Sequence, residues 1–515
     1  MLLVNERVDD QQLIYARVIG LLVSSRDIKF DDVLAYELAA YPPSMFNSEG
    51  EMKIAKSKST LKHIIQVTVS ERNCPVPDTV IYDVSALLWV IPWPTDKPSV
   101  YVNNFKTFVS QALQTANVTL VFDRYFPSSI KAFTRMHRGG STGVHILTPE
   151  MLAPAKQVVV TNTKNKVQLH AMLAEGLLDS DYYTNATQNH TLTIAGISDA
   201  PVEIANGVRI DRRDLCSTHE EADILITQHA ISLSLLGKTV RVVCDDTDVF
   251  VLLVHFYNSK CKGSNAAPMI MSSPLKERAV VDICATAEAH SDIAGDLLAI
   301  HGLPGADTVA SLHGIGKATV IKVSKTGRFS LSQVGDVTAD MKSVEAQATN
   351  FICSAYGKIT QSCTSMTECR VKMWHSKTGK SGASSVKLCS LPPTSDAFIE
   401  NVHRGHLQVA VWKAALQESP PNMDPTKYGW EFDHERILQP RTVPSGTLSA
   451  PPEILQLIRC SCQTSRCRTA ACSCSKLGCT IFCACEGGQA CENPLTQRSS
   501  ELEASDMATH ETDED

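Results

Sequence analysis

One segment, Val240 to Phe256 with the sequence VRVVCDDTDVFVLLVHF, constrains the fold more than any other part of the chain. A valine-rich run leads into Asp245, Asp246 and Asp248, and a second apolar run follows at once. Like charges this close repel, and burying a carboxylate without a partner is costly. The three aspartates must therefore lie at an exposed strand end, or positive groups must lie beside them.

Acidic residues accompany other apolar segments in a similar way. Asp83 ends the run DTVIYD, Asp123 ends ANVTLVFD, and Glu220–Asp223 (EEAD) begins a helical pattern. Apolar strands that alternate with helices predict an α/β domain with a mainly parallel sheet, whose strand ends share one functional edge. Helix capping explains any single strand-end aspartate. It explains poorly the presence of five acidic clusters, the fifth being Asp307 in PGAD.

The order of these acids resembles the flap endonuclease family of structure-specific 5′ nucleases, within the PIN-like fold. The motifs YDVSALL, VFDRYF, EEADIL, CDDTDVF and GADTVASLHGIGKA carry the resemblance, which covers residues 78–325. It implies hydrolysis of a phosphodiester to leave a 5′-phosphate, with two Mg²⁺ or Mn²⁺ ions that take oxygen ligands and stabilise the attacking and leaving oxygens. The metal-binding acids that it implies are Asp83, Asp123, Glu221, Asp223, Asp246, Asp248 and Asp307.

A basic segment, RYFPSSIKAFTRMHR, begins directly after Asp123. In the resembled family a helix at this place carries a lysine and an arginine, seven positions apart, that help to position the scissile phosphate. Lys131 and Arg138 have that spacing and are assigned that role by the resemblance. A solvated basic helix face is the alternative.

The sequence SLHGIGKATVIK, which follows Asp307, resembles the helix-hairpin-helix of the same family. Such a turn offers backbone N–H groups to a DNA phosphate. The nucleic-acid-binding residues implied here are Gly314, Gly316, Lys317 and Lys322. The motif is not a P-loop, because Ala318 stands where a serine or threonine is required.

Two features depart from that family. Eighty-two residues precede Asp83, whereas family members usually begin almost at their first strand. The stretch between Asp123 and Glu221 is long and contains strand-like segments, KQVVVTN and HTLTIAG, where the family has a helical arch. The way in which a flap would thread, and the geometry of the substrate, are therefore left open.

The cysteines form a second pattern, since nine of the 18 lie between positions 460 and 491. The chain shows no signal peptide and no apolar run of the ~18 residues that span a bilayer, which predicts an intracellular protein with reduced thiols rather than disulfides. Nine thiolates suit three zinc ions joined by bridging sulfurs. The expected ligands are Cys460, Cys462, Cys467, Cys472, Cys474, Cys479, Cys483, Cys485 and Cys491.

This tract resembles the CXC domain of tesmin and TSO1-like proteins, which binds zinc and often contacts DNA. The basic residues within reach of phosphates are Arg459, Arg466, Arg468 and Lys476. The family usually has a tyrosine before its fourth cysteine, where this chain has Ala471. A zinc module that is only structural, or that binds protein, therefore remains an alternative.

The predicted organisation has five parts. They are a helical extension (1–76), a nuclease domain (77–326), a helical and linker region (327–455), a zinc domain (456–494) and an acidic tail (495–515). The formal net charge of −7 reflects the tail, ELEASDMATHETDED, so bulk charge gives no sign of nucleic-acid binding. We expect His403 and His406 to be surface or packing residues rather than ligands, and Trp89 and Trp93 to belong to the core rather than to stack on bases.

The combined expectation is a nuclear, metal-dependent nuclease directed to DNA by its zinc module, with an architecture suggestive of a mobile-element origin. Two alternatives stay open. One is a catalytically inactive PIN-like protein that binds DNA or acts as a scaffold, and the other is a PIN-like nuclease directed to RNA. No membrane partner is expected, and the sequence predicts no particular protein partner.

Overall fold

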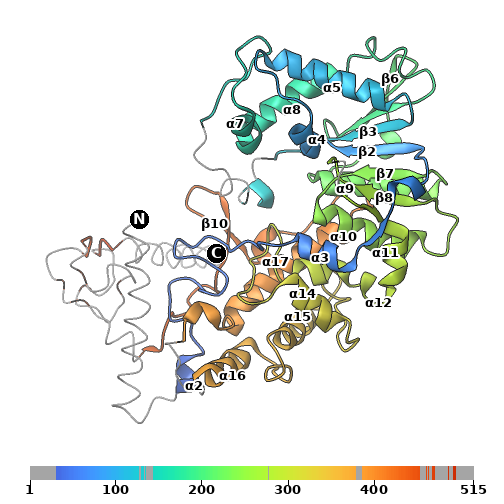
Figure 1. Cartoon of the computed structure of the whole chain (residues 1–515). Helices are drawn as coiled ribbons and strands as arrows, with labels where there is room; N and C mark the ends of the chain where they lie inside the picture. The colour runs from blue at the N-terminus through green and yellow to red at the C-terminus, as the bar shows by residue number, and fades with distance from the viewer. Residues whose placement is uncertain are drawn as a thin grey trace, which may run out of the picture.

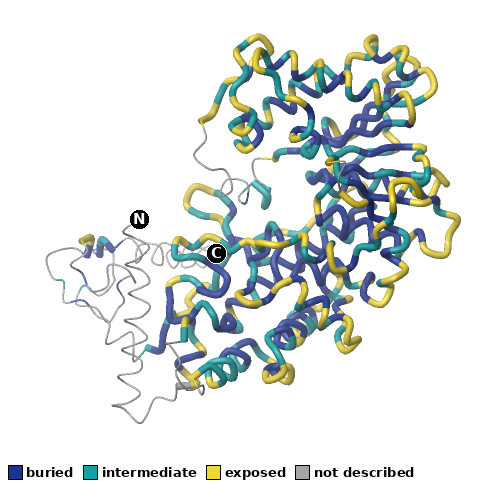
Figure 2. The backbone as a smooth tube through the Cα atoms, viewed as in Figure 1, coloured by how far each residue is buried: buried dark blue, intermediate teal, exposed yellow. Residues whose placement is uncertain are grey.

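The structure is a computed structural model. It describes residues 30–126, 129–132, 134, 143–275, 278–378, 386–452, 460, 462, 467–469, 472, 479, 485 and 491–493. These residues form a mixed α/β fold in which helices cover both faces of one large sheet (Figure 1). Buried residues gather along the sheet and the helices beside it (Figure 2).

The sheet has nine strands in the order β1-β9-β8-β7-β2-β3-β4-β5-β6. The strands are β1 (Val67–Val69), β2 (Thr79–Asp83), β3 (Asn117–Val121), β4 (Leu192–Ala195), β5 (Val202–Ala205), β6 (Val208–Asp211), β7 (Val240–Val243), β8 (Met269–Ser272) and β9 (Val280–Asp282). The central strands β8, β7, β2, β3 and β4 are parallel, and the outer strands pair antiparallel. The predicted mainly parallel sheet is thus confirmed.

Side chains of the central strands alternate between two hydrophobic cores, as the two-residue period of a strand requires. Leu120 and Ile194 face a core shared with helices α4 (Val84–Val90), α5 (Pro98–Ala112), α7 (Lys156–Thr161) and α8 (Thr163–Leu177). Ile81, Val121 and Val242 face the opposite, larger core. The apolar strands are therefore buried on both faces, as expected of a parallel sheet.

The larger core is covered by most of the remaining helices. They are α3 (Ser59–Ile65), α9 (Ala222–Leu235), α10 (Thr247–Phe256), α11 (Ile283–Ala289), α12 (Ser291–Ala294), α13 (Leu297–Gly302), α14 (Lys317–Ser324), α15 (Met341–Ala355), α16 (Met366–Thr378) and α17 (Ser395–Lys413). Helix α17 packs against α13 and α15, so the region after residue 326 shares a core with the sheet domain. No described helix is long and apolar enough to cross a membrane.

Two local expectations were wrong. Residues 30–76 are mostly irregular, with the short helices α2 (Phe30–Val33) and α3, a 3₁₀ turn at Glu71–Asn73, and strand β1 at the sheet edge. The segment KQVVVTN forms helix α7, whereas HTLTIAG contains strand β4 as predicted. A short β-branched run can form a strand or a helix, and here the packing of Val159 and Val160 against the smaller core favours the helix.

A small hairpin, β10 (Trp430–Phe432) and β11 (Leu438–Pro440), follows α17.

Candidate active site

The strand-end aspartates lie where parallel strands turn into helices. Asp83 ends β2 and caps α4, accepting a hydrogen bond from the Ser85 N–H at 2.8 Å. Asp246 follows β7 and caps α10 in the same way, accepting from the Asp248 N–H at 2.8 Å. Asp123 comes two residues after β3. Capping thus accounts for one oxygen of Asp83 and one of Asp246, and leaves the second oxygen of each for other partners.

Asp223, Asp246 and Asp248 form the centre of the site. Each offers one carboxylate oxygen, and these oxygens all lie within 4.8 Å of one another. Asp248 is buried, while Asp246 keeps part of its surface in contact with solvent, although neighbouring groups crowd its carboxylate. Lost hydration and repulsion from Asp246 raise the pKa of Asp223 well above its ordinary value. Lost hydration and repulsion from Asp248 raise the pKa of Asp246 to about 6. A bound cation would relieve the repulsion among these three carboxylates.

Asp83 and Asp123 lie beside this centre and are joined through Ser85, whose hydroxyl donates to Asp123 at 2.9 Å. Lost hydration and repulsion from Asp123 raise the pKa of Asp83 to about 7. Asp123 behaves differently. Burial alone would raise its pKa, but attraction to Lys166, 3.7 Å away, together with the effects of His170, Lys131 and the Ser85 hydroxyl, lowers it.

Two further lysines enter the site. The Lys58 ammonium forms ion pairs with Asp307 and with Asp248, the latter at 3.4 Å. Burial alone would lower the pKa of Lys58, but attraction to these two carboxylates raises it. Lys131 forms an ion pair with Glu221 at 2.8 Å and is likewise held charged. Burial would lower its pKa, but attraction to Glu221, Asp223 and Asp307 together raises it.

A buried layer behind the acids holds them in place. His301 is fully buried, and its Nε2 donates to the Asp248 carboxylate at 2.7 Å. Burial lowers the pKa of His301 to about 4, so the ring is neutral at pH 7. The Lys317 ammonium donates to the carbonyl oxygens of His301 and Gly305, the latter at 2.7 Å. It thereby ties α14 to the loop that carries Asp307.

The predicted phosphate-binding role of Lys317 is wrong, because the side chain is buried and its ammonium binds carbonyl groups. Lys322 on the same helix is exposed. Gly314 has a φ of +78°, and Gly316 caps α14 in an extended conformation, so the turn itself is present. A helix-hairpin-helix is not shown, because the connection from Leu303 to Gly316 that precedes α14 is irregular.

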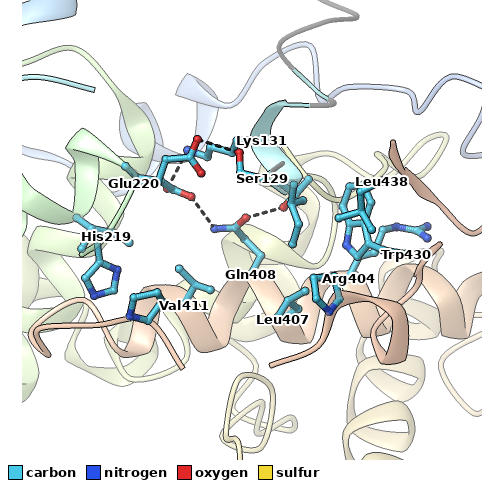
Figure 3. A pocket seen from close by; sticks show the side chains of 16 residues that line it. Ser129, Lys131, His219, Glu220, Arg404, Leu407, Gln408, Val411, Trp430 and Leu438 are labelled. Atoms are coloured by element: carbon cyan, nitrogen blue, oxygen red, sulfur yellow. Dashed lines mark hydrogen bonds and ion pairs between the residues drawn. The ribbon is translucent and has the colours of Figure 1, made fainter. Parts of the chain in front are cut away.

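Helix α17 completes the site from the far end of the chain. Gln408 donates to Glu221 at 3.4 Å and accepts from the Thr308 hydroxyl at 2.6 Å (Figure 3). Asn401 donates to and accepts from the backbone of Ala310, at 3.1 and 3.0 Å. Both contacts fix the segment that follows Asp307 relative to the other acids.

A cavity of about 250 Å³ lies beside Glu221 and Lys131. Side chains from α17, from the 129–131 segment and from the β10–β11 hairpin line it (Figure 3). Its wall is mixed, with Ile224, Leu407 and Trp430 as apolar members. The acidic edge of the sheet therefore continues into a hollow that has apolar and polar groups side by side.

The described cysteines form a cluster of their own. Two groups of four thiols each place their sulfurs within 4.8 Å of one another: Cys460, Cys462, Cys467 and Cys472, and Cys460, Cys467, Cys479 and Cys485. The two groups share Cys460 and Cys467, as bridging thiolates would. The sulfur of Cys491 lies 3.8 Å from that of Cys485. This arrangement is compatible with a zinc cluster.

Several predicted residues lie outside the described part of the chain. They are Arg138, Arg459, Arg466, Lys476, Cys474 and Cys483. Arg468 is described and exposed. Among the residues expected to pack or lie at the surface, His403 pairs with Glu345 at 2.7 Å and His406 accepts from the Gly335 N–H at 3.1 Å. The expectation that Trp89 belongs to the core is wrong, since it is 51% exposed, whereas Trp93 packs against the smaller core.

Sequence reasoning missed four contributors: Lys58, Lys166, His301 and Gln408. Lys58 lies 249 residues before Asp307 in the chain, so no local spacing links the two. The dense apolar pattern around His301 was the one available signal, since a histidine buried there needs a partner.

No protein-family model matches this chain, and no curated protein does so either. A search of solved structures finds the catalytic core of Rad2 in complex with DNA substrate. The two chains are 12% identical over 70% of this chain and 98% of that one, with a TM-score of 0.30.

Proposed function

We propose that this chain is a metal-dependent nuclease of the PIN-like, flap-endonuclease-like type that hydrolyses phosphodiester bonds of DNA. One observation carries the proposal: Asp223, Asp246 and Asp248 present oxygens within 4.8 Å of one another at the carboxyl edge of a parallel sheet. The four other acids of the expected set lie around this centre. Asp307 pairs with Lys58 and Glu221 pairs with Lys131. Asp123 accepts from the Ser85 hydroxyl, and Asp83 contacts the Cys244 thiol.

The donor chemistry fits a hard divalent cation. All candidate ligands are carboxylate oxygens, which Mg²⁺ and Mn²⁺ prefer. When bound, such ions lower the pKa of a water and stabilise a leaving oxyanion. Without a cation, several negatively charged carboxylates would lie close together in a partly dehydrated site, which raises the free energy of the folded protein. The sequence predicts two Mg²⁺ or Mn²⁺ ions at this site.

The protein side chains have distinct roles in this proposal. Lys131, beside Glu221, is placed to attract a scissile phosphate that enters from the cavity side. Asp83, whose pKa is raised to about 7, is a group able to accept a proton from the attacking water near neutral pH. Attack on phosphorus breaks the bond to the 3′ oxygen and leaves a 5′-phosphate and a 3′-hydroxyl.

The cysteine cluster supplies the second part of the proposal. We infer a CXC-like module with about three zinc ions, the number that nine thiolates with bridging sulfurs satisfy. Exposed Arg468, together with Arg459, Arg466 and Lys476, would give it affinity for nucleic acid. A nuclear location and a mobile-element origin belong to the same proposal.

A cleavage panel tests the function. The full-length, zinc-loaded protein is incubated with Mg²⁺ or Mn²⁺ and end-labelled flap DNA, gapped DNA, single-stranded DNA or single-stranded RNA. We expect metal-dependent cleavage of at least one DNA substrate with 5′-phosphate products. Cleavage of RNA alone would favour the RNA-directed alternative. Binding of DNA without cleavage of any substrate would favour the inactive scaffold.

A further inference from the structure

The ammonium of Lys58 lies between two carboxylates that were expected to bind metal. It contacts Asp307 and lies 3.4 Å from Asp248. Its side chain is only 20% exposed, and the Asp248 side chain is 3% exposed. A positive charge is thus already built into one side of the acidic site.

The position of Lys58 is fixed by its surroundings. It directly precedes helix α3, which packs against α10 and α14. The segment before it is bound to the loop that follows Asp307, because the Ser311 N–H donates to the Lys53 carbonyl at 2.7 Å. A second backbone bond, from the His313 N–H to the Ser44 carbonyl, has a length of 3.2 Å. Lys58 and Asp307 are therefore held by elements that are bonded to each other.

Only some of the acids near Lys58 lie close enough together to share a metal ion. Asp223, Asp246 and Asp248 form a group in which three ligands are close enough for one ion. Within the described residues, Asp307 belongs to no such group of three. The geometry thus offers one cation position made of carboxylates and one place where the cation is an ammonium.

We propose that Lys58 takes the place of a second divalent ion, so that the folded protein binds one Mg²⁺ or Mn²⁺, at Asp223, Asp246 and Asp248. This inference rests on the proposed nuclease function and specifies its cation requirement. An ammonium is a compact charge with three N–H donors. It neutralises Asp248 and Asp307 and can donate to a phosphate oxygen, but it does not polarise a bound water as a metal ion does.

Counting bound Mn²⁺ tests the inference without reference to cleavage. Isothermal titration and electron paramagnetic resonance of free Mn²⁺ are applied to the full-length, zinc-loaded protein and to Lys58→Met. Lys56→Met is the matched control, because Lys56 is an exposed lysine two positions earlier. We expect one Mn²⁺ for the wild type and for Lys56→Met, and two for Lys58→Met. Lys58→Arg, which keeps the charge, should bind one.

The outcomes separate this inference from the function on which it rests. Two ions in the wild type, or equal counts in the wild type and Lys58→Met, would overturn the role of Lys58 and leave the nuclease proposal standing. No Mn²⁺ bound by any of the proteins would overturn both. A melting curve would show whether Lys58→Met folds. If it does not fold, the number of Mn²⁺ ions bound by the wild type still tests the inference.

Discussion

Asp245 and Asp246 are neighbours in sequence, but their carboxylates have different partners. Asp245 accepts from the Ser273 hydroxyl at 2.7 Å and pairs with Arg278 at 2.9 Å, on the outer side of the site. Asp246 joins Asp223 and Asp248 in the acidic centre. The same residue type one position apart therefore serves a structural ion pair in one case and the candidate metal site in the other.

Asp246→Asn should abolish metal-dependent cleavage and leave the fold intact. The asparagine keeps an oxygen for the Asp248 N–H, so the cap of α10 survives while one ligand charge is lost. We expect a fall in cleavage rate of roughly 100-fold or more, since a catalytic metal contributes several kcal/mol. Relief of repulsion should raise the melting temperature without Mg²⁺ or Mn²⁺. Asp245→Asn is the control and should cleave normally; equal activity of the two variants would contradict a role for Asp246.

The pH dependence of stability should carry the signature of Asp83. Its pKa of about 7 in the folded protein exceeds the unfolded value of 3.8, so the folded state binds the extra proton between those values. Stability without Mg²⁺ or Mn²⁺ is therefore lost as pH rises from about 4 to about 7. Asp83→Asn removes this contribution and keeps the cap of α4.

The measurement is a series of urea unfolding curves at pH 4.5 to 8 for the wild type and Asp83→Asn. Buffers are freed of Mg²⁺ and Mn²⁺ while zinc is retained. The wild type should lose roughly 2–4 kcal/mol relative to the variant across this range. A difference that does not change with pH would mean that the pKa of Asp83 is not raised. Ionisable groups that do not interact with Asp83 cancel in the comparison.

At the scale of elements, helix α14 carries one buried lysine and one exposed lysine. Lys317 is buried and bound to the carbonyls of His301 and Gly305, whereas Lys322 is exposed. Lys317→Met should destabilise the protein by about 1–3 kcal/mol, because two buried carbonyl groups lose their donor. It should also weaken Mn²⁺ binding, because the backbone of His301, whose ring holds the Asp248 carboxylate, is no longer tethered.

Lys322→Met is the matched variant on the same helix. We expect unchanged unfolding curves and unchanged Mn²⁺ binding, with weaker binding of DNA at low salt if this surface contacts phosphates. Chemical denaturation of both variants, together with DNA binding at two salt concentrations, checks the pair. Equal stability of Lys317→Met and the wild type would contradict the tethering role of Lys317.

The sheet could be predicted from sequence because its strands are short apolar runs that end in acids. Asp83, Asp123 and Asp246 could be assigned to one edge, because the carboxyl ends of parallel strands meet there. The positive partners could not be assigned. Lys58 and Gln408 approach from segments before and after the resembled region, and tertiary packing alone brings them to the acids.

Local composition also misled the prediction in places where packing decides. The valine run of α7 has high strand propensity, but it covers the smaller core as a helix. Lys317 follows a turn suited to phosphate binding, and yet its side chain points to buried carbonyl groups. A glycine-rich turn indicates the path of the backbone, not the direction of the next side chain.

At the scale of the whole molecule, the cysteine cluster is joined to the rest of the protein. Cys460, Cys467 and Cys479 belong to one buried cluster with Leu34 and Leu388, which lie far away in sequence. A strong zinc chelator should therefore expose the cysteine tract and also the segments around Leu34 and Leu388. The sheet should stay folded, because it has its own cores.

Native mass spectrometry before and after chelation should count about three zinc ions, since nine thiolates with bridging sulfurs satisfy that number. Hydrogen exchange should show loss of protection at 33–38 and 388–391, and no loss in β2 or β7. A segment that keeps its structure without zinc would contradict metal-dependent folding, as would a single zinc ion per chain.

Helix α17 sets the order in which a growing chain acquires its site. Gln408 lies 187 residues after the Glu221 carboxylate that it contacts. At translation rates of about 5–20 residues per second, roughly 10–40 s separate the synthesis of the two. The sheet and its acids are completed within that interval, but until α17 follows, Glu221 lacks its amide partner and α13 lacks the helix that covers it. A nascent chain therefore carries an unfinished site, and completion waits for α17 to be made.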